Sequence, residues 1–174
     1  MMDTEMMIAL AIVLGTAIWT DLRSGLIPNR LTFSTMGLAI LLHGWLNGFP
    51  GMVYSLTGLG TGFALFIFFY LTGGMGAGDV KLMAAIGAII GAYGVLISGV
   101  LAIMAGGIYA LGALCYQWGF LETCRKLSFA TYGAFHQRGE AWNHDLQLPF
   151  RLRYGIPIAA GTLLFSLGFN PFEG

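Results

Sequence analysis

Charged side chains are scarce in this chain of 174 residues, because aspartate, glutamate, lysine and arginine together make up only 9% of it. A typical soluble domain carries about 25% charged and about 45 to 50% apolar residues. Here the apolar share is 57% and the mean hydropathy is +0.77. This composition excludes an ordinary soluble domain and predicts an integral membrane protein. With a net charge of +0, we expect the lipid bilayer, and not nucleic acid, as its surroundings.

Metal-binding side chains are also few. The two cysteines, Cys115 and Cys124, form no CxxC pair, so we expect packing residues and not a zinc site. His136 and His144 lie in a polar stretch without the spacing of metal ligands. His43, near the outer end of an apolar run, is expected at the membrane interface. We therefore predict no metal centre.

The apolar residues come in runs of about the length that crosses a bilayer core of roughly 30 Å. The chain starts with two acids and no base in residues 1–5, so we expect the first run to be a retained span and not a cleaved signal peptide. Turn signals such as NGFPG at 47–51 and GAYG at 91–94 separate the runs. The predicted spans are residues 6–20, 31–46, 52–71, 79–90, 95–117 and 154–169, of which the fourth is short for a full crossing.

The basic residues give these spans an orientation. All of them fall in or beside the first, third and fifth connections: Arg23, Arg30, Lys81, Arg125, Lys126, Arg138, Arg151 and Arg153. Lysine and arginine favour the cytoplasmic side of a membrane. We predict an all-α bundle of about six transmembrane helices with both termini on the non-cytoplasmic side. Residues 1–174 would form one membrane-embedded domain with a cytoplasmic connection at about 118–153.

That connection contains one amphipathic pattern. Its apolar stripe recurs at helical spacing, in Phe120, Cys124, Leu127, Thr131 and Phe135. The pattern fits a helix lying in the membrane interface. It fits a helix packed on the cytoplasmic face of the domain equally well.

Glycine is abundant, with 27 residues. Small residues at helical spacing let membrane helices approach closely. We therefore expect close helix packing at the glycines in and around the third and fourth spans, which are Gly58, Gly60, Gly62, Gly87 and Gly91.

Two carboxylates stand out, because the predicted topology places them at one depth. Asp21 lies at the cytoplasmic end of the first span and Asp79 at the cytoplasmic start of the fourth. Acids at membrane depth are costly and usually mark function. If the two converge, they cannot both ionise easily, so they share a proton and offer an acid and a base in one site. This is the chemistry of aspartic proteases.

Structural explanations stay open beside the catalytic one. Asp79 follows Gly78 and can cap the fourth helix, and Lys81 can pair with an acid or extend towards the headgroups. The alternative function is a non-catalytic membrane protein, either a proton or ion relay or a structural subunit of a pilus assembly system. Acids of transporters usually lie near mid-bilayer, whereas these two lie near one face.

Three motifs resemble those of a known family. DLRSGLIPN at 21–29 and GAGDVKLMAAIG at 76–87 are similar to the paired signature of the type IV prepilin peptidases, which are membrane aspartic proteases with a GxGD motif. RYGIPIAAG at 153–161 resembles their third motif, a proline-containing entry to the last span. The three occur in the expected order and spacing.

The resemblance implies a function. Members of the family are multi-pass proteins of the prokaryotic inner membrane that cut the short leader from prepilins or pseudopilins at the cytoplasmic face, in pilus assembly and protein secretion. It implies Asp21 and Asp79 as the catalytic pair, with water as nucleophile and no cofactor. The candidate substrate-binding or loop-shaping residues are Gly76, Gly78, Lys81, Pro28, Asn29 and Pro157.

The chain also departs from part of the family. Bifunctional members carry an additional cytoplasmic domain, often with a four-cysteine zinc site, that is linked to N-methylation of the mature pilin. No CxxC pair and no stretch before Asp21 could supply it. The chain is therefore similar to the short, peptidase-only form of tight-adherence (Flp) pilus systems, and we predict neither zinc nor methyl transfer.

Overall fold

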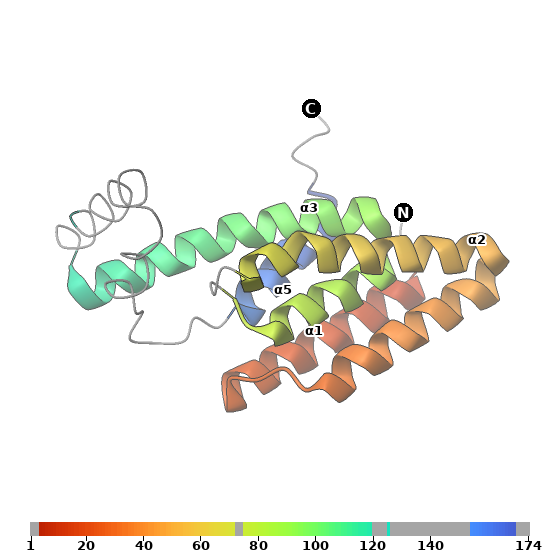
Figure 1. The fold of residues 1–174 in the computed structure, drawn as a ribbon, viewed down its shortest axis with the longest axis horizontal. Coiled ribbons are helices and arrows are strands. Elements are labelled where there is room, and N and C mark those ends of the chain that lie inside the picture. Colours follow the sequence, from red (N-terminus) through yellow and green to blue (C-terminus); the bar gives the residue numbers. More distant parts are fainter. Residues whose placement is uncertain (1–3, 72–74, 120–124, 126–153, 170–174) are drawn as a thin grey trace. The chain divides into compact units, whose positions relative to one another are not determined.

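The computed structural model describes residues 4–71, 75–119, 125 and 154–169. Its helices are α1 (Thr4–Ser24), α2 (Asn29–Leu71), α3 (Ala77–Trp118) and α5 (Gly155–Ser166) (Figure 1). The described part of the chain contains no strand. The prediction of an all-α protein is confirmed for these residues.

Two glycines interrupt the long helices. Gly48 in α2 has φ 63° and ψ −149°, and Gly91 in α3 has φ 75° and ψ 177°. Only glycine adopts such positive φ values at little cost. Figure 1 shows α2 folding back on itself at its break, and the part of α3 up to Gly106 does the same. Pro50 follows the first break, in the opening turn of a helical segment, where its missing N–H breaks no hydrogen bond.

Among the described residues, three helices are long and apolar enough to cross a membrane, at Met6–Ser24, Asn29–Leu71 and Ala77–Tyr116, while α5 is a shorter apolar helix of 12 residues. The breaks at Gly48 and Gly91 coincide with the turn signals in the sequence. The helical segments on either side of them therefore follow the predicted apolar runs to within a few residues. The count of six crossings and the side of the termini stay predictions.

The chain divides into two compact units, Met1–Gly106 with Arg153–Gly174, and Gly107–Leu152. All the candidate site residues belong to the first unit. The prediction of a single domain stays a prediction. The amphipathic pattern predicted in the connection at 118–153 lies outside the described residues, apart from Trp118, Gly119 and Arg125.

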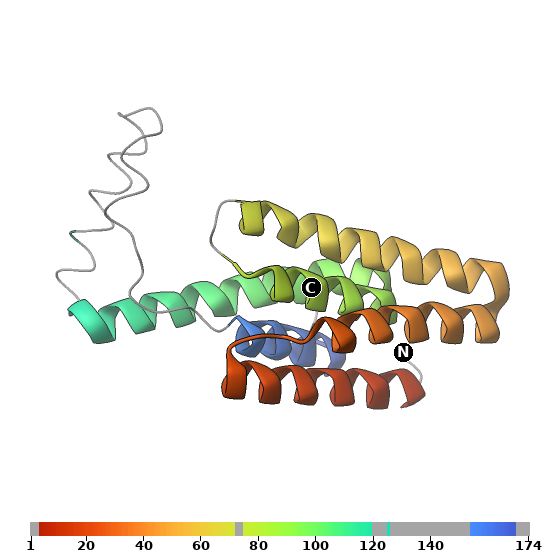
Figure 2. The ribbon, with the colours of Figure 1, turned by 60° about the horizontal axis from the view of Figure 1, so that its bottom comes forward.

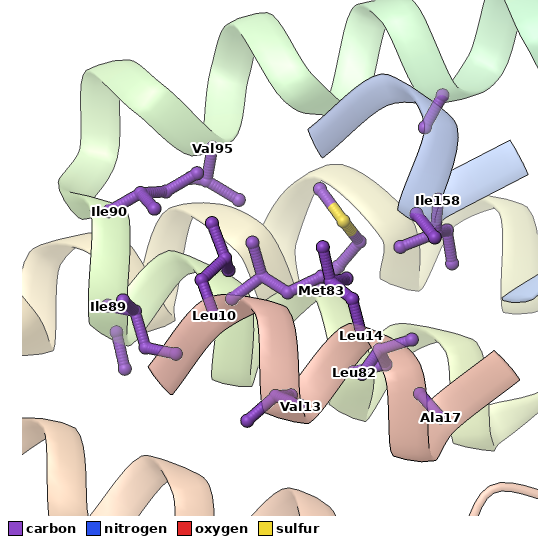
Figure 3. Packing of buried hydrophobic residues seen from close by; sticks show 14 of the residues in the cluster. Leu10, Val13, Leu14, Ala17, Leu82, Met83, Ile89, Ile90, Val95 and Ile158 are labelled. Carbon is purple, nitrogen blue, oxygen red and sulfur yellow. The ribbon is translucent and has the colours of Figure 1, made fainter. Parts of the chain in front are cut away.

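The first segment of α3 forms the centre of the first unit. Every residue from Leu82 to Ile90 is buried, and a helix that is apolar all round belongs in an interior. Figure 3 shows side chains of α1 and α5 packed near it. The buried stripe of α1 has the i, i+3, i+4, i+7 spacing of one helix face, in Leu10, Val13, Leu14 and Ala17. The predicted span at 79–90, which is short for a full crossing, is thus the central helix.

Close glycine packing joins this central helix to α2. A Cβ added at Gly87 would lie 2.8 Å from the carbonyl carbon of Gly58, and a Cβ at Gly62 would lie 2.9 Å from that of Met83. No real Cβ comes so near to backbone. The packing prediction is confirmed for these three glycines. It is also confirmed for Gly91, which forms the break and whose Cα would lie 2.8 Å from a Cβ added at Gly58. It is wrong for Gly60, which has open space around it.

Side chains of α2 bind the carbonyl groups that the break at Gly91 leaves without helical partners. Ser55 Oγ donates to the Ala88 carbonyl at 2.8 Å, and Tyr54 donates its hydroxyl to the Ile90 carbonyl at 2.7 Å. His43 Nε2 lies 3.0 Å from the carbonyl oxygen of Ile89. The final turn of a helix needs such partners wherever water is excluded. His43 is buried, and its position at the membrane interface stays a prediction.

Candidate active site

Asp21 lies in the last turn of α1, where its own helix does not favour it. The C-terminal end of a helix dipole is negative and repels a carboxylate. Gly25, with φ 64°, ends the helix, and its N–H donates to the Asp21 carbonyl at 2.9 Å. The Asp21 side chain is nevertheless only 5% exposed. A buried acid at this end of a helix needs a partner from elsewhere in the chain.

The partner is the start of α5. Asp21 Oδ2 accepts a hydrogen bond from the backbone N–H of Gly155 at 3.2 Å. Tyr154 occupies the N-cap position of α5 and makes no side-chain cap of its own. Asp21 therefore caps α5 from α1, and Figure 2 shows these two helices running side by side. The positive end of the α5 dipole favours a carboxylate here.

Asp79 lies in the first turn of α3 and is 9% exposed. Its Oδ2 accepts a hydrogen bond from the backbone N–H of Gly76 at 3.2 Å, while the Asp79 N–H donates to the Gly76 carbonyl at 3.1 Å. The first contact is the acidic half of a capping box, and the second is a backbone turn bond. The capping interaction anticipated for Asp79 is thus present, and a cap does not prevent the same carboxylate from doing chemistry.

Tyr154 and Gly155, which are consecutive in the chain, lie near Asp79 and Asp21 respectively. Gly155 bonds to Asp21, and Tyr154 lies near enough to Asp79 for the carboxylate to act electrostatically on its phenol. The Tyr154 ring is half-buried against α3, where a Cβ at Gly106 would lie 3.1 Å from its Cε1 atom. The start of α5 thus lies beside both aspartates. Sequence reasoning named Pro157 of this motif as a candidate site residue and did not name Tyr154 or Gly155. A contact made by a backbone N–H leaves no pattern in the sequence.

The two motifs that carry the aspartates also touch each other. Ile27, of the I-P-N element, is buried, and a Cβ on Gly78 would lie 3.3 Å from its Cβ. Part of the glycine-rich loop, residues 72–74, lies outside the described residues. The missing side chain of Gly78 therefore makes room for Ile27, which fits a loop-shaping role.

Lys81 joins the same two motifs. Its Nζ donates to Asn29 Oδ1 at 2.9 Å and lies 5.4 Å from the centroid of the Phe33 ring. An ammonium over an aromatic face adds a favourable electrostatic contact. Lys81 thus uses an amide and a ring of α2 as partners, and the contact ties the start of α3 to the start of α2.

The two prolines occupy helix starts. Pro28 is exposed, and its carbonyl accepts from the N–H groups of Leu31 at 3.1 Å and Thr32 at 3.4 Å. Pro157 is buried in the first turn of α5, where a proline needs no N–H partner. Among the described residues, no group of three or more His, Cys, Asp or Glu side chains could hold a metal ion.

The apolar helices and the two buried carboxylates, at the end of α1 and the start of α3, define a membrane protein with a candidate acid–base pair. The chain belongs to the type IV leader peptidase family, whose model matches residues 8–111. That match includes both aspartate motifs and ends before the motif at 153–161. Neither the curated proteins nor the solved structures contain a match to the chain. Family membership implies proteolytic activity on prepilin-type substrates.

Proposed function

We propose that this protein is a membrane aspartic endopeptidase that removes the leader peptide of a prepilin or pseudopilin at the cytoplasmic face of a prokaryotic inner membrane. Asp21 and Asp79 are its catalytic pair. The observation that carries the proposal is the burial of both carboxylates, with Asp21 held by the Gly155 N–H at the start of α5 and the neighbouring Tyr154 packed on α3, the helix that carries Asp79. Both carboxylates are buried, and both belong to the family-matched region.

A pair of carboxylates that shares one proton can hydrolyse a peptide without a cofactor. The ionised carboxylate takes a proton from a water molecule, whose oxygen attacks the peptide carbonyl carbon. The protonated carboxylate donates a hydrogen bond to the carbonyl oxygen and transfers its proton as negative charge develops there. The carboxyl group that took the water proton then gives it to the peptide nitrogen as the C–N bond breaks, and the other carboxylate takes its proton back as the C=O bond forms again. Either aspartate can fill either role, because a coupled pair titrates as a unit.

The proposed topology brings the site to the cytoplasmic face. The breaks at Gly48 and Gly91 divide α2 and α3 into two segments each, so that six crossings fit the helices. The connections that carry Arg23, Arg30 and Lys81 then lie on the side that the positive-inside rule assigns to the cytoplasm. A prepilin leader would reach the aspartates from that side.

The capping contacts suggest how to separate chemistry from structure. An asparagine at position 21 or 79 keeps an oxygen that accepts from Gly155 or Gly76, so both helix caps persist. It cannot ionise or transfer a carboxyl proton. A structural subunit that has lost its chemistry would therefore tolerate the substitution, whereas a peptidase would not.

The test is cleavage of a co-expressed prepilin by the wild type, Asp21→Asn and Asp79→Asn, read from the mass of the new pilin N-terminus. We expect the wild type to cut and each variant to lose at least about 1000-fold in rate, the order seen when a member of a catalytic unit is removed. Membrane levels of all three should match. Cleavage by either variant at a rate near that of the wild type contradicts the paired mechanism and favours the relay or structural alternative.

A further inference from the structure

We propose that Gly155 is a positioning residue that holds the Asp21 carboxylate in its working orientation, through its N–H and through the absence of a side chain. The inference rests on the proposed function in that Asp21 is taken as catalytic. The inference goes beyond the proposed function by assigning a role to a residue outside both aspartate motifs. Gly155 is buried, in the first turn of α5.

The space beside Gly155 is filled by Asp21. A Cβ added at Gly155 would lie 2.6 Å from Asp21 Oδ2 and 3.2 Å from both the Cβ and the Cγ of Asp21. The side chain of Asp21 therefore lies flat against the α-carbon of Gly155. Any larger residue at position 155 must push the carboxylate away or move α5.

The backbone N–H of Gly155 supplies the orientation. It donates to Oδ2 at 3.2 Å and is one of the N–H groups that a helix start leaves without a helical partner. A carboxylate held at a helix N-terminus gains both a hydrogen bond and a favourable dipole. The contact therefore fixes the direction of one carboxyl oxygen and leaves the rest of the group for chemistry.

Gly155 also links Asp21 to α3, the helix that carries Asp79, through the residue that precedes it. Tyr154, the preceding residue, is packed against Gly106 of α3 and interacts with Asp79. A shift of the chain at position 155 thus changes the placement of Asp21 relative to the neighbour of Asp79. A misplacement of about 1 Å in a catalytic group can slow an enzyme about 100-fold.

The test compares Gly155→Ala with the wild type in prepilin cleavage. We expect kcat to fall about 10- to 100-fold, while KM stays within about twofold, since substrate binding does not depend on the orientation of Asp21. Gly60→Ala is the matched control, because open space surrounds Gly60, and it should leave kcat unchanged. An unchanged kcat in Gly155→Ala overturns the inference. So does a rise in KM alone.

A second measurement tests the contact without using activity. Amide hydrogen exchange in the first turn of α5 should speed up in Asp21→Ala, which removes the acceptor of the Gly155 N–H, and should stay slow in Asp21→Asn, which keeps one. Equal exchange in both variants overturns the inference whatever the enzyme does. If exchange behaves as expected but Asp21→Asn still cuts, the contact stands, and it is the proposed function that fails.

Discussion

At the scale of single residues, the two aspartates combine a structural contact with a candidate catalytic role. Each uses Oδ2 to accept a backbone N–H at a helix start, Asp21 from Gly155 and Asp79 from Gly76. Such contacts restrict the rotation of a carboxyl group. Catalytic groups need this restriction, because their orientation must be set before the substrate arrives. The caps therefore fit both a structural and a catalytic role, and the asparagine variants separate the two.

Lys81 and Asn29 connect the two aspartate motifs. They stand 52 positions apart in sequence, and their side chains are joined by a hydrogen bond of 2.9 Å. Lys81 lies two residues after Asp79, and Asn29 closes the motif that begins with Asp21. The bond therefore helps to hold the segments that carry the two carboxylates together at their exposed ends.

At the scale of helices, the first segment of α3 is fixed at both ends. Asp79 and Gly76 close its start, and Ser55, Tyr54 and His43 of α2 bind the carbonyl groups at its break. In an apolar surrounding, each unpaired backbone group would destabilise the fold by several kcal/mol, in the range of about 2 to 7 kcal/mol. The segment that carries Asp79 is therefore held as a rigid element.

The glycine contact between α2 and α3 gives a prediction at this scale. Gly87→Val places side-chain atoms against the backbone of Gly58, which has no freedom to move aside. We expect the variant to lose about 1 to 3 kcal/mol of stability by overpacking, measured as a lower unfolding midpoint of the purified protein in detergent. Gly60→Val, in open space, is the control.

The two variants of this comparison differ only in what surrounds the glycine. If Gly87→Val unfolds at the same midpoint as Gly60→Val, the close approach of α2 and α3 at Gly87 is contradicted. The same result would remove the support that α2 gives to the helix carrying Asp79.

Sequence patterns predicted the helices better than their contacts. Apolar runs and turn signals located the breaks at Gly48 and Gly91, because glycine and polar turn residues interrupt helices in any context. They did not separate Gly87, in contact with α2, from Gly60, which faces open space, since both have the same local spacing. His43 and Gly155 were missed for a related reason. Each contact pairs one side chain with one backbone group, His43 with the Ile89 carbonyl and Asp21 with the Gly155 N–H, and every sequence contains such backbone groups.

At the scale of the whole molecule, helix length argues for more crossings than there are continuous helices. α2 has 43 residues, which would extend about 65 Å at 1.5 Å per residue. The bilayer core is only about 30 Å thick. The chain folds back at Gly48, and we propose that each half of α2 makes one crossing. The same argument applies to α3, with 42 residues and a break at Gly91.

Cysteine labelling tests this topology. In a chain whose native cysteines are replaced by serine, we expect a membrane-impermeant maleimide to label Asn47→Cys in intact spheroplasts. Ser24→Cys should react only after lysis, because the six-span arrangement places residue 24 in the cytoplasm and residue 47 outside. Both positions are exposed in the structure. Equal labelling of the two variants in intact spheroplasts would contradict the arrangement.

We propose that Asp21 and Asp79 act as one catalytic unit. This is tested most directly by measuring kcat/KM on one prepilin for the wild type, for each single asparagine variant and for the double variant. Members of a unit are not additive, so that losing either one removes nearly all of the catalysis they share. We predict that the double variant is no slower than the slower single variant, within about threefold. If the losses of the two single variants multiply in the double variant, the aspartates act independently and the account of a shared-proton pair is wrong.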